Sequence, residues 1–415
     1  MPQVPQQQPR IPFRAWYILA LAGMAGMMYY LDRQTLSVLK TTLKGVFGWS
    51  DIEYGWLTAI FMVPYTIGYF FAGRLIDRFG TRVMMPVFLC TMSAVTLLTA
   101  SSSQLWQFAA CRMALGFAGA GVVPMVMVTI VTWFPHDRRG TANMFSKPFS
   151  SAGNILVTPL AVSLATAFGW RWAFIVPGLT GVALALMWIM ADRNPPQYTA
   201  PAATSPVASA SSSLASLLRN RTLWGLILAR AISDPLWFFL MFWQPGYLQE
   251  ELDMSFAKLG WVGWIPFAVS LVMNMVLSRF SDVLIDRGWT PQKGRLRLLQ
   301  LTACLSPAMI IMPFVTSHAG VIAILCVVQA MALVWFNLTN LLMADVMPRH
   351  QVGTCVGIIN ACGAGTGALV NFTAGWLLAQ FGYPALFIAG ALLHPLAAGV
   401  LWWFYQRRPG SAAVQ

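Results

Sequence analysis

The stretch GRLIDRFGTR, residues 73–82, interrupts a chain that consists mostly of apolar runs. It holds four charged residues in ten and separates the apolar run 55–73 from the run 83–101. Of all 415 residues only 9% are charged and 58% are hydrophobic, whereas a soluble domain carries roughly 25% charged residues. The stretch is therefore expected to be a short polar loop between two helices that cross a membrane.

Apolar runs of about 20 residues recur along the chain, and each is long enough to cross a hydrocarbon layer of ~30 Å as a helix. They lie at 15–38, 55–73, 83–101, 106–134, 143–167, 172–191, 222–248, 259–278, 298–314, 320–343, 351–380 and 384–405. The sequence thus predicts an all-α membrane protein with twelve transmembrane helices.

A degenerate copy of the opening stretch occurs in the second half of the chain. SRFSDVLIDRG, residues 278–288, separates the eighth and ninth apolar runs, as the opening stretch separates the second and third. Ser278 stands where Gly73 does, and Asp282 stands where Asp77 does. Related loops at matched positions indicate a duplicated architecture of two pseudo-symmetric bundles.

The boundary between the two halves is expected in a segment of low complexity. Residues 199–213 read TAPAATSPVASASSS, and such a Ser-, Ala- and Pro-rich segment cannot form a core. We therefore predict a six-helix bundle at 1–194, a cytoplasmic linker at 195–220 and a second six-helix bundle at 221–415.

The net charge of +13 is distributed unevenly. When both chain ends are placed on one side, most of the 26 Lys and Arg residues fall on that side or within spans. Those that fall on the opposite side are Lys40, Lys44, Arg171 and Lys258. This bias predicts cytoplasmic termini, as the positive-inside rule requires. The basic excess is thus an orientation signal in a multi-pass protein of a bacterial inner membrane, and no nucleic-acid partner is expected.

The residues that usually bind metals or nucleotides show no suitable spacing. The six cysteines include no CxxC pair, and the four histidines include no HExxH. The glycine clusters at 116–121 and 363–367 lack the Gly-Lys-Ser/Thr ending of a phosphate-binding loop. We expect no metal, no cofactor and no catalytic residues.

The opening stretch resembles the loop signature G-x-x-x-D-R-x-G-x-R of the major facilitator superfamily. The matching residues are Gly73, Asp77, Arg78, Gly80 and Arg82. The resemblance extends over essentially the whole chain and implies the fold of that superfamily. In it, these residues would form a latch that holds one conformation of the alternating-access cycle, with tight turns and close helix approach at the glycines.

A finer resemblance is to the anion:cation symporter branch, which includes hexuronate and galactonate transporters. Its first-helix pattern Tyr-x-Asp-Arg is matched by Tyr30, Asp32 and Arg33, its second-helix Tyr by Tyr65, and its fourth-helix Arg by Arg112. Residues 169–174 also resemble its connection between the fifth and sixth helices, and residues 233–248 look most like the hexuronate transporters. The stretch that starts at Ala344 resembles them more loosely, and its firmest part is 345–349. The resemblance implies transport of a small organic anion.

One position departs from that branch. Many relatives have a Glu that takes part in proton coupling seven residues after the fourth-helix Arg, where this chain has Gly119. Asp32 is then the only carboxylate within the spans of the first half. We predict that Asp32 carries the coupled proton and keep Asp234 as the reserve candidate.

A charged side chain inside a membrane is costly and usually faces a watery cavity or a partner. Arg33 and Arg112 are expected to converge on a cavity between the halves and to bind a carboxylate, because the guanidinium fork suits that group. Tyr30 should share the face of Arg33, and Tyr65 should lie nearby. Asp32 should point roughly 100° away. The alternative is that the three charged residues neutralise one another as structural glue.

Other polar or aromatic residues within the spans are weaker candidates for substrate contact. They are Trp237, Asn337, Asn340 and Asn360. The alternative is that they form hydrogen bonds between helices, which are worth ~0.6 kcal/mol on average.

The predicted function is a secondary transporter that imports a small organic anion, such as a hexuronate or aldonate, by proton symport. An exporter or uniporter, and transport of another carboxylate or a sulfonate, remain alternatives. A membrane receptor or enzyme is less supported, since no sizeable soluble domain is present. The expected partners are the organic anion, protons and the lipid bilayer, and the chain is expected to act as a monomer.

Overall fold

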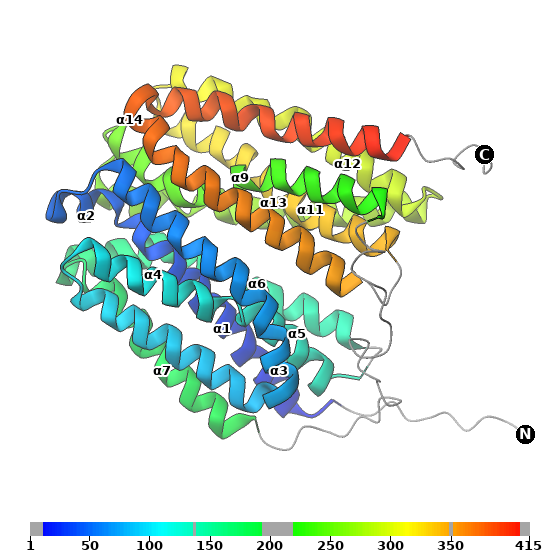
Figure 1. Cartoon of the computed structure of the whole chain (residues 1–415), viewed down its shortest axis with the longest axis horizontal. Helices are drawn as coiled ribbons and strands as arrows, with labels where there is room; N and C mark the ends of the chain where they lie inside the picture. Colours follow the sequence, from blue (N-terminus) through cyan, green and yellow to red (C-terminus); the bar gives the residue numbers. More distant parts are fainter. Residues whose placement is uncertain (1–10, 136–137, 193–218, 348–351, 407–415) are drawn as a thin grey trace, which may run out of the picture.

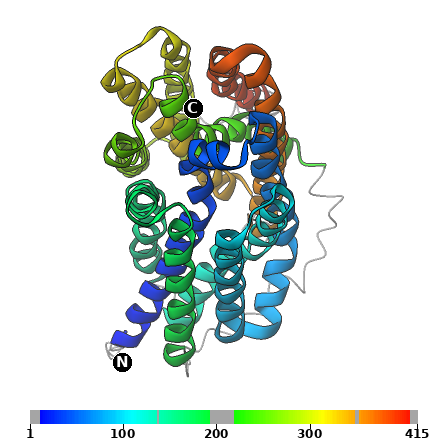
Figure 2. The ribbon, with the colours of Figure 1, turned by 90° about the vertical axis from the view of Figure 1, so that its left-hand side faces the viewer.

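The computed structural model describes residues 11–135, 138–192, 219–347 and 352–406, and every regular element in these ranges is a helix. The helices of the first half form one bundle and those of the second half form another, packed side by side (Figures 1 and 2). Residues 195–218 of the predicted linker lie outside the described ranges. An all-α fold is thus confirmed.

The first half contains α1 (Phe13–Val38), α2 (Lys40–Phe47), α3 (Asp51–Ser101), α4 (Leu105–Gly119), α5 (Val122–Trp133), α6 (Arg139–Phe168) and α7 (Trp172–Ala191). The second half contains α9 (Arg221–Glu250), α10 (Phe256–Val262), α11 (Ile265–Asp286), α12 (Pro291–Leu305), the 3-10 helix η2 (Ser306–Phe314), α13 (His318–Val346) and α14 (Val352–Gln406). The α2 end of the molecule is on the left in Figure 1, and the terminal end, where α1 begins and α14 ends, is on the right.

Two of these helices consist of two arms joined at a glycine. α3 bends at Gly80, with φ 73°, and α14 bends at Gly382, with φ 69°. Positive φ values of this size favour glycine, because a Cβ would clash with the backbone. The bend at Gly80 lies inside the predicted loop 73–82, so a tight turn there is confirmed. The expected length of the loop is wrong, because Gly80 alone has non-helical φ and ψ and the rest of the stretch continues the two arms.

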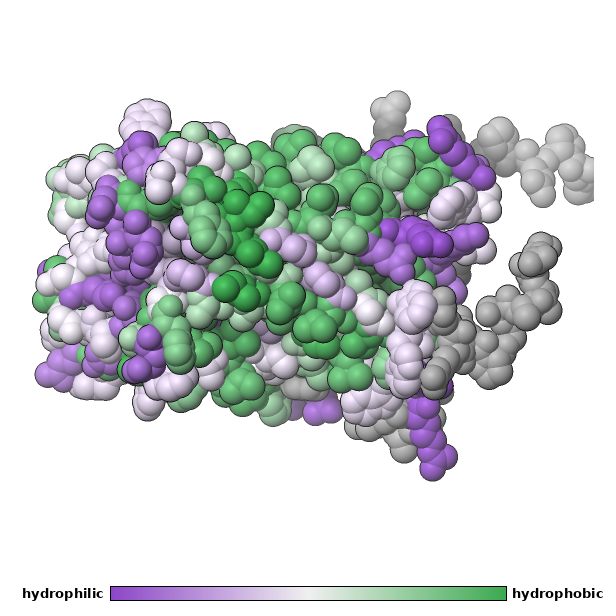
Figure 3. Space-filling view, turned by 90° about the horizontal axis from the view of Figure 1, so that it is seen from above, coloured by the Kyte–Doolittle hydropathy of each residue, from purple (hydrophilic) through white to green (hydrophobic). Residues whose placement is uncertain are grey.

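The surface carries a belt of apolar side chains between two polar ends (Figure 3). Within the described residues, nine helical segments are long and apolar enough to cross a membrane. α1 and the first arm of α3 are not among them, and one segment, Thr354–Tyr405, includes both arms of α14. The chain is a multi-pass membrane protein, while the number of twelve spans stays a prediction.

The two halves approach each other closely at the α2 end. A Cβ on Gly375 of α14 would lie 2.3 Å from the backbone oxygen of Asp51 in α3. A Cβ on Gly55 of α3 would lie 2.9 Å from the backbone oxygen of Asn371 in α14. Small residues of this kind let membrane helices pack with their backbones in near contact. The α2 end is therefore closed.

Candidate functional site

Arg33 lies in the middle of the molecule, on the side of α1 that faces α9. Its side chain is only 3% exposed. Nη1 donates a hydrogen bond of 3.2 Å to the hydroxyl of Tyr29, Nη2 contacts the sulfur of Met241, and Nε has no partner. Among the described residues no carboxylate forms an ion pair with Arg33. A thioether is a poor acceptor, so this buried cation is incompletely satisfied.

Aromatic rings surround the Arg33 guanidinium from both halves. Its central carbon lies 5.2 Å from the ring centre of Tyr30 and 5.5 Å from that of Tyr29, both in the first half. From α9, the ring centres of Phe238 and Phe242 lie 5.8 and 5.9 Å away. Such rings stabilise a cation through their π faces. Arg33 therefore lies in an aromatic cage at the seam between the halves.

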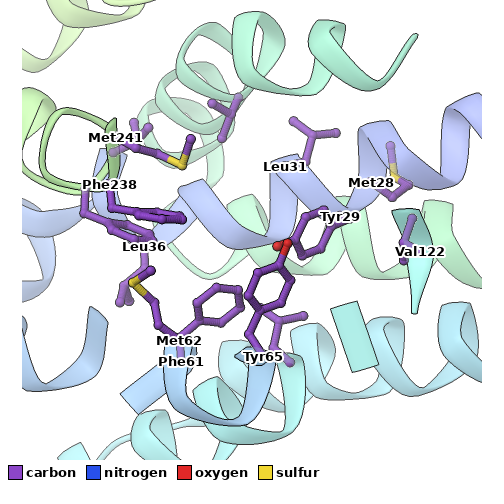
Figure 4. Close-up of a cluster of buried hydrophobic side chains, with 14 of the residues drawn as sticks. Met28, Tyr29, Leu31, Leu36, Phe61, Met62, Tyr65, Val122, Phe238 and Met241 are labelled. Carbon is purple, nitrogen blue, oxygen red and sulfur yellow. The ribbon is translucent and has the colours of Figure 1, made fainter. Parts of the chain in front are cut away.

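Tyrosine hydroxyls extend this cage toward α3. Tyr65 stacks on Tyr29 with ring centres 5.8 Å apart, and its hydroxyl lies 2.9 Å from that of Tyr69. Figure 4 shows Tyr29 and Tyr65 pointing toward each other, with Phe238 and Met241 on the α9 side. The structure thus brings the predicted residues Tyr30 and Tyr65 into the surroundings of Arg33, and it adds Tyr29, which sequence reasoning missed.

Gly119 explains how Tyr29 fits between α1 and α4. A Cβ on Gly119 would lie 2.4 Å from Cε2 of Tyr29 and 2.7 Å from its Cδ2. The ring of Tyr29 therefore occupies the space into which any side chain at position 119 would extend. The glycine that stands in place of the expected helix-four acid was the sequence signal for this packing.

Asp32 points into the interior of the first half. Its side chain is buried, and one of its carboxylate oxygens has no hydrogen-bond partner. It lines a cavity with room for about one water molecule. The other lining residues are Thr96, Thr99, Cys111, Arg112, Leu115 and Phe174. Asp32 and Arg33 thus lie in different environments, as their angular separation on the helix predicted.

Arg112 connects these two environments. It is 4% exposed, lines the Asp32 cavity, and donates a hydrogen bond of 2.9 Å from Nη1 to the backbone oxygen of Arg33. The structure therefore brings Arg112 to the backbone of Arg33 and not to its guanidinium. The convergence of both side chains on one anion stays a prediction.

A second buried arginine ties the helices of the second half together. Arg230 of α9 is completely buried and pairs with Asp234 at 2.8 Å. It also donates to the backbone oxygen of Phe336, to the hydroxyl of Thr339 and to the side-chain oxygen of Asn360. Asp234 and Asn360, predicted as proton and substrate residues, are here partners of a cation that links α9, α13 and α14.

The remaining polar candidates of the second half contact neighbouring protein groups. Asn337 donates to the side-chain oxygen of Asn274 at 3.0 Å and so joins α13 to α11. Asn340 donates to the backbone oxygen of Phe336 at 3.1 Å, and its own side-chain oxygen has no partner. Trp237 of α9 is buried in the hydrophobic core. Substrate contact by these residues stays a prediction.

The signature loop at the terminal end is anchored through a residue that follows α7. Thr81 donates to one carboxylate oxygen of Asp192 at 3.1 Å, and Trp133 donates to the other at 3.2 Å. Burial raises the pKa of Asp192, although these hydrogen bonds oppose that rise. Gly80 thus turns the chain so that Thr81 meets the ends of α5 and α7.

For Gly73, Arg78 and Arg82 the structure shows no hydrogen bond like that of Thr81 among the described residues. A Cβ on Gly73 would meet nothing within 4 Å, so the expected close helix approach is absent there. Arg78 lies over the ring of its neighbour Phe79 at 5.3 Å. Burial raises the pKa of Asp192, and the positive charge of Arg82 opposes that rise. The side chain of Asp77 lies outside the described residues, and the latch role stays a prediction.

An ion cluster closes the α2 end. We use this name for Lys40, Lys44 and Asp51 of the first half with Glu250 and Tyr383 of the second. Lys40 Nζ lies 2.8 Å from Asp51 and 2.7 Å from Glu250, and it donates to the Tyr383 hydroxyl at 3.2 Å. Lys44 Nζ lies 2.9 Å from Asp51 and 3.2 Å from Glu250. Burial alone would raise the pKa of Asp51, but the two lysines hold it below its ordinary value.

The model of the Major Facilitator Superfamily matches residues 22–371. The chain belongs to this superfamily. As a major facilitator it is a membrane transporter and not an enzyme, which confirms the resemblance of its loop signature.

Curated relatives are sugar-acid transporters by name. The probable L-galactonate transporter of Escherichia coli K12 is 30% identical over 67% of this chain, a match that covers 64% of that relative. The hexuronate transporter of the same strain is 25% identical over 96% of both chains. The probable galactarate/D-glucarate transporter GarP is 26% identical over 88% of both chains.

Solved structures confirm the major facilitator fold. An inward-facing bacterial homologue of the human lysosomal transporter Spinster superposes with a TM-score of 0.77, at 16% identity and over 95% of both chains. The D-xylose-proton symporter superposes with a TM-score of 0.72, at 18% identity, over 94% of this chain and 97% of that one. At such identities the likeness concerns the fold alone.

Proposed function

We propose that this major facilitator imports a sugar acid together with protons, and that Arg33 binds the carboxylate. The observation that supports this most is the state of Arg33, which is buried at the seam of the halves, has an unused N–H and pairs with no carboxylate among the described residues. A buried cation is stable only with a counterion or full hydrogen bonding. A substrate carboxylate supplies both, because it accepts two parallel hydrogen bonds from a guanidinium.

The chemistry around Arg33 supports a polyhydroxylated acid. The hydroxyls of Tyr65 and Tyr69 lie 2.9 Å from each other and can each exchange that bond for one to a sugar hydroxyl. The three relatives named above transport galactonate, hexuronates, or galactarate and glucarate by name. Export, uniport, or transport of another carboxylate or sulfonate remain the alternatives.

The proposed orientation places the terminal end in the cytoplasm and the α2 end outside a cell membrane. The excess of Lys and Arg on the loops of the terminal end supports it. In this orientation the ion cluster seals the outer side, and the substrate reaches Arg33 from outside only after the cluster has separated.

We assign the coupled proton to Asp32. Its carboxylate is buried, has an oxygen without a partner, and faces a cavity lined by Arg112. Asp234 is less suited, because Arg230 already pairs with it at 2.8 Å. The hydrogen bond from Arg112 to the backbone of Arg33 offers a direct mechanical link from the proton site to the anion site.

Uptake by whole cells tests the anion site. Labelled D-glucuronate and L-galactonate are supplied with and without a protonophore, and uptake is expected to fall when the proton gradient is removed. Arg33→Lys keeps the charge but loses the fork, so the half-saturation concentration should rise steeply. Arg171→Lys is the control, since Arg171 lies at the α2 end over Trp170. Normal half-saturation in Arg33→Lys would contradict the assignment.

Asp32→Asn tests the proton site separately. The variant should lose accumulation against a gradient but keep exchange of labelled for unlabelled substrate, because exchange requires no net proton release. Accumulation at the level of the parent chain, still sensitive to a protonophore, would point instead to Asp234.

A further inference from the structure

In the ion cluster the first half contributes two positive charges but only one negative charge, so it depends on the second half for neutralisation. Lys40, Lys44 and Asp51 all belong to the first half, whereas Glu250 belongs to α9 of the second. When the α2 end opens, Glu250 must leave with α9 while Asp51 stays beside the lysines. Two ammonium groups then share one carboxylate.

Opening also exposes the side chain of Lys40, because most of the residues that pack against it belong to the second half. Its Nζ lies 4.7 Å from the ring centre of Trp243. A Cβ on Gly246 would lie only 2.6 Å from Cδ of the same lysine. Both residues are on α9, while the ring of Tyr54, 5.3 Å from Nζ, remains with the first half. Separation of α9 therefore exposes the ammonium group on the side where the passage forms.

Lys40 is well placed to pass a ligand on to Arg33. The two residues are seven apart, which corresponds to about 10 Å along a helix and to nearly the same face. Hydrogen bonds from the backbone N–H of Leu39 to Thr35 and of Leu43 to Leu39 continue the helical path from α1 into α2. The cationic face of the cluster thus extends directly to the aromatic cage.

We propose that Lys40 and Lys44 form a second anion site, which the carboxylate of an incoming organic acid occupies in the position that Glu250 holds when the α2 end is closed. The substrate and Glu250 therefore compete for the same two lysines. This inference rests on the proposed orientation and on import of an organic acid. The site attracts the anion from outside, since clustered charge of one sign raises association rates.

The test compares the two faces of the membrane. Initial rates with labelled D-glucuronate are measured in right-side-out and inside-out vesicles. Lys44→Gln should raise the half-saturation concentration at the outer face about tenfold and leave that at the inner face unchanged. Added salt should raise the outer value less than in the parent chain, because part of the attraction that salt screens has been removed and only Lys40 remains in the site. Lys40→Gln should act alike, and Lys44, 23% exposed, is the safer site for substitution.

Lys258→Gln is the matched control. Lys258 also lies at the α2 end, but its Nζ contacts His318 at 2.6 Å and forms no ion pair with Asp51 or Glu250 among the described residues, so the outer half-saturation concentration should not change. Glu250→Gln removes the competitor and should lower that concentration.

Equal changes at both faces in Lys44→Gln, or no change at the outer face, would overturn the inference. So would a raised outer half-saturation concentration in Glu250→Gln. These outcomes are distinct from failure of the proposed function, in which neither face would transport the acid even in the parent chain.

Discussion

Replacing Gly119 with alanine should weaken substrate binding through Tyr29. The added Cβ would lie 2.4 and 2.7 Å from two carbons of the Tyr29 ring, whereas carbon atoms pack at about 3.5–4.0 Å. The ring must therefore move by roughly 1 Å, and overpacking of this kind costs about 1–3 kcal/mol. The movement would also break the 3.2 Å hydrogen bond from Arg33 to the Tyr29 hydroxyl.

If about 1.4 kcal/mol of this cost is lost from the free energy of substrate binding at Arg33, the half-saturation concentration rises about tenfold. Uptake of labelled D-glucuronate into proteoliposomes measures it. Gly365→Ala is the control, because a Cβ on this glycine of α14 would meet nothing within 4 Å. In a Tyr29→Ala background the ring is absent, so Gly119→Ala should have almost no further effect.

An equal loss from Gly119→Ala in the parent chain and in the Tyr29→Ala background would refute this reasoning. So would a normal half-saturation concentration in the single variant. Either result would mean that the ring of Tyr29 does not fix the position of Arg33.

Three further predictions concern the ends and the core of the molecule. Gly246→Ala should loosen the ion cluster, because the added Cβ would lie only 2.6 Å from Cδ of Lys40. A membrane-impermeant thiol reagent should then label a cysteine introduced as Ser37→Cys faster than it does when Gly246 is retained. An unchanged labelling rate would contradict this prediction. Since the lysines hold the pKa of Asp51 below its ordinary value of 3.8, its ion pairs are stable above that value and are lost only as the pH falls through the lowered pKa. Thiols react as thiolates, so the labelling rate of Ser37→Cys is divided by that of a freely exposed cysteine; this ratio should not change between about pH 8 and pH 5, and a higher ratio at pH 5 would contradict this. Arg230→Met leaves Asp234 as an unpaired buried charge and should lower the unfolding free energy in detergent by about 3–5 kcal/mol; an unchanged thermal midpoint would show that the pair is not structural.

The sequence predicted the helical fold and the place of Tyr30 beside Arg33 because both follow from periodicity along single helices, whereas Tyr65 was placed near Arg33 by the resemblance to the symporter branch. The apolar runs predicted the spans. Asp32 and Arg33 are adjacent in the sequence, which predicted that they point in different directions from one helix. The fold of two bundles followed from the repeated loops together with the resemblance to the superfamily.

Contacts between helices could not be predicted in the same way. The packing of Tyr29 against Gly119 was missed because Gly119 lies on another helix, whereas the contact of Tyr29 with Arg33, four residues away on α1, was predictable in principle. The burial of Lys40 depends on Gly246, which lies about 200 residues further along the chain. The pairing of Arg230 with Asp234 was predictable in principle, because residues four apart share a helix face.

The placement of Asp32 and Arg33 has a consequence for how such transporters diversify. Every residue that lines the Asp32 cavity comes from the first half, whereas Arg33 faces Phe238, Met241 and Phe242 on α9. A substitution on α9 can therefore reshape the space beside Arg33 without touching the residues that line the Asp32 cavity, where we propose that the coupled proton binds. If the proposed sites are correct, evolution can exchange one acid for another by substitutions in the second half while the proton site in the first half stays the same.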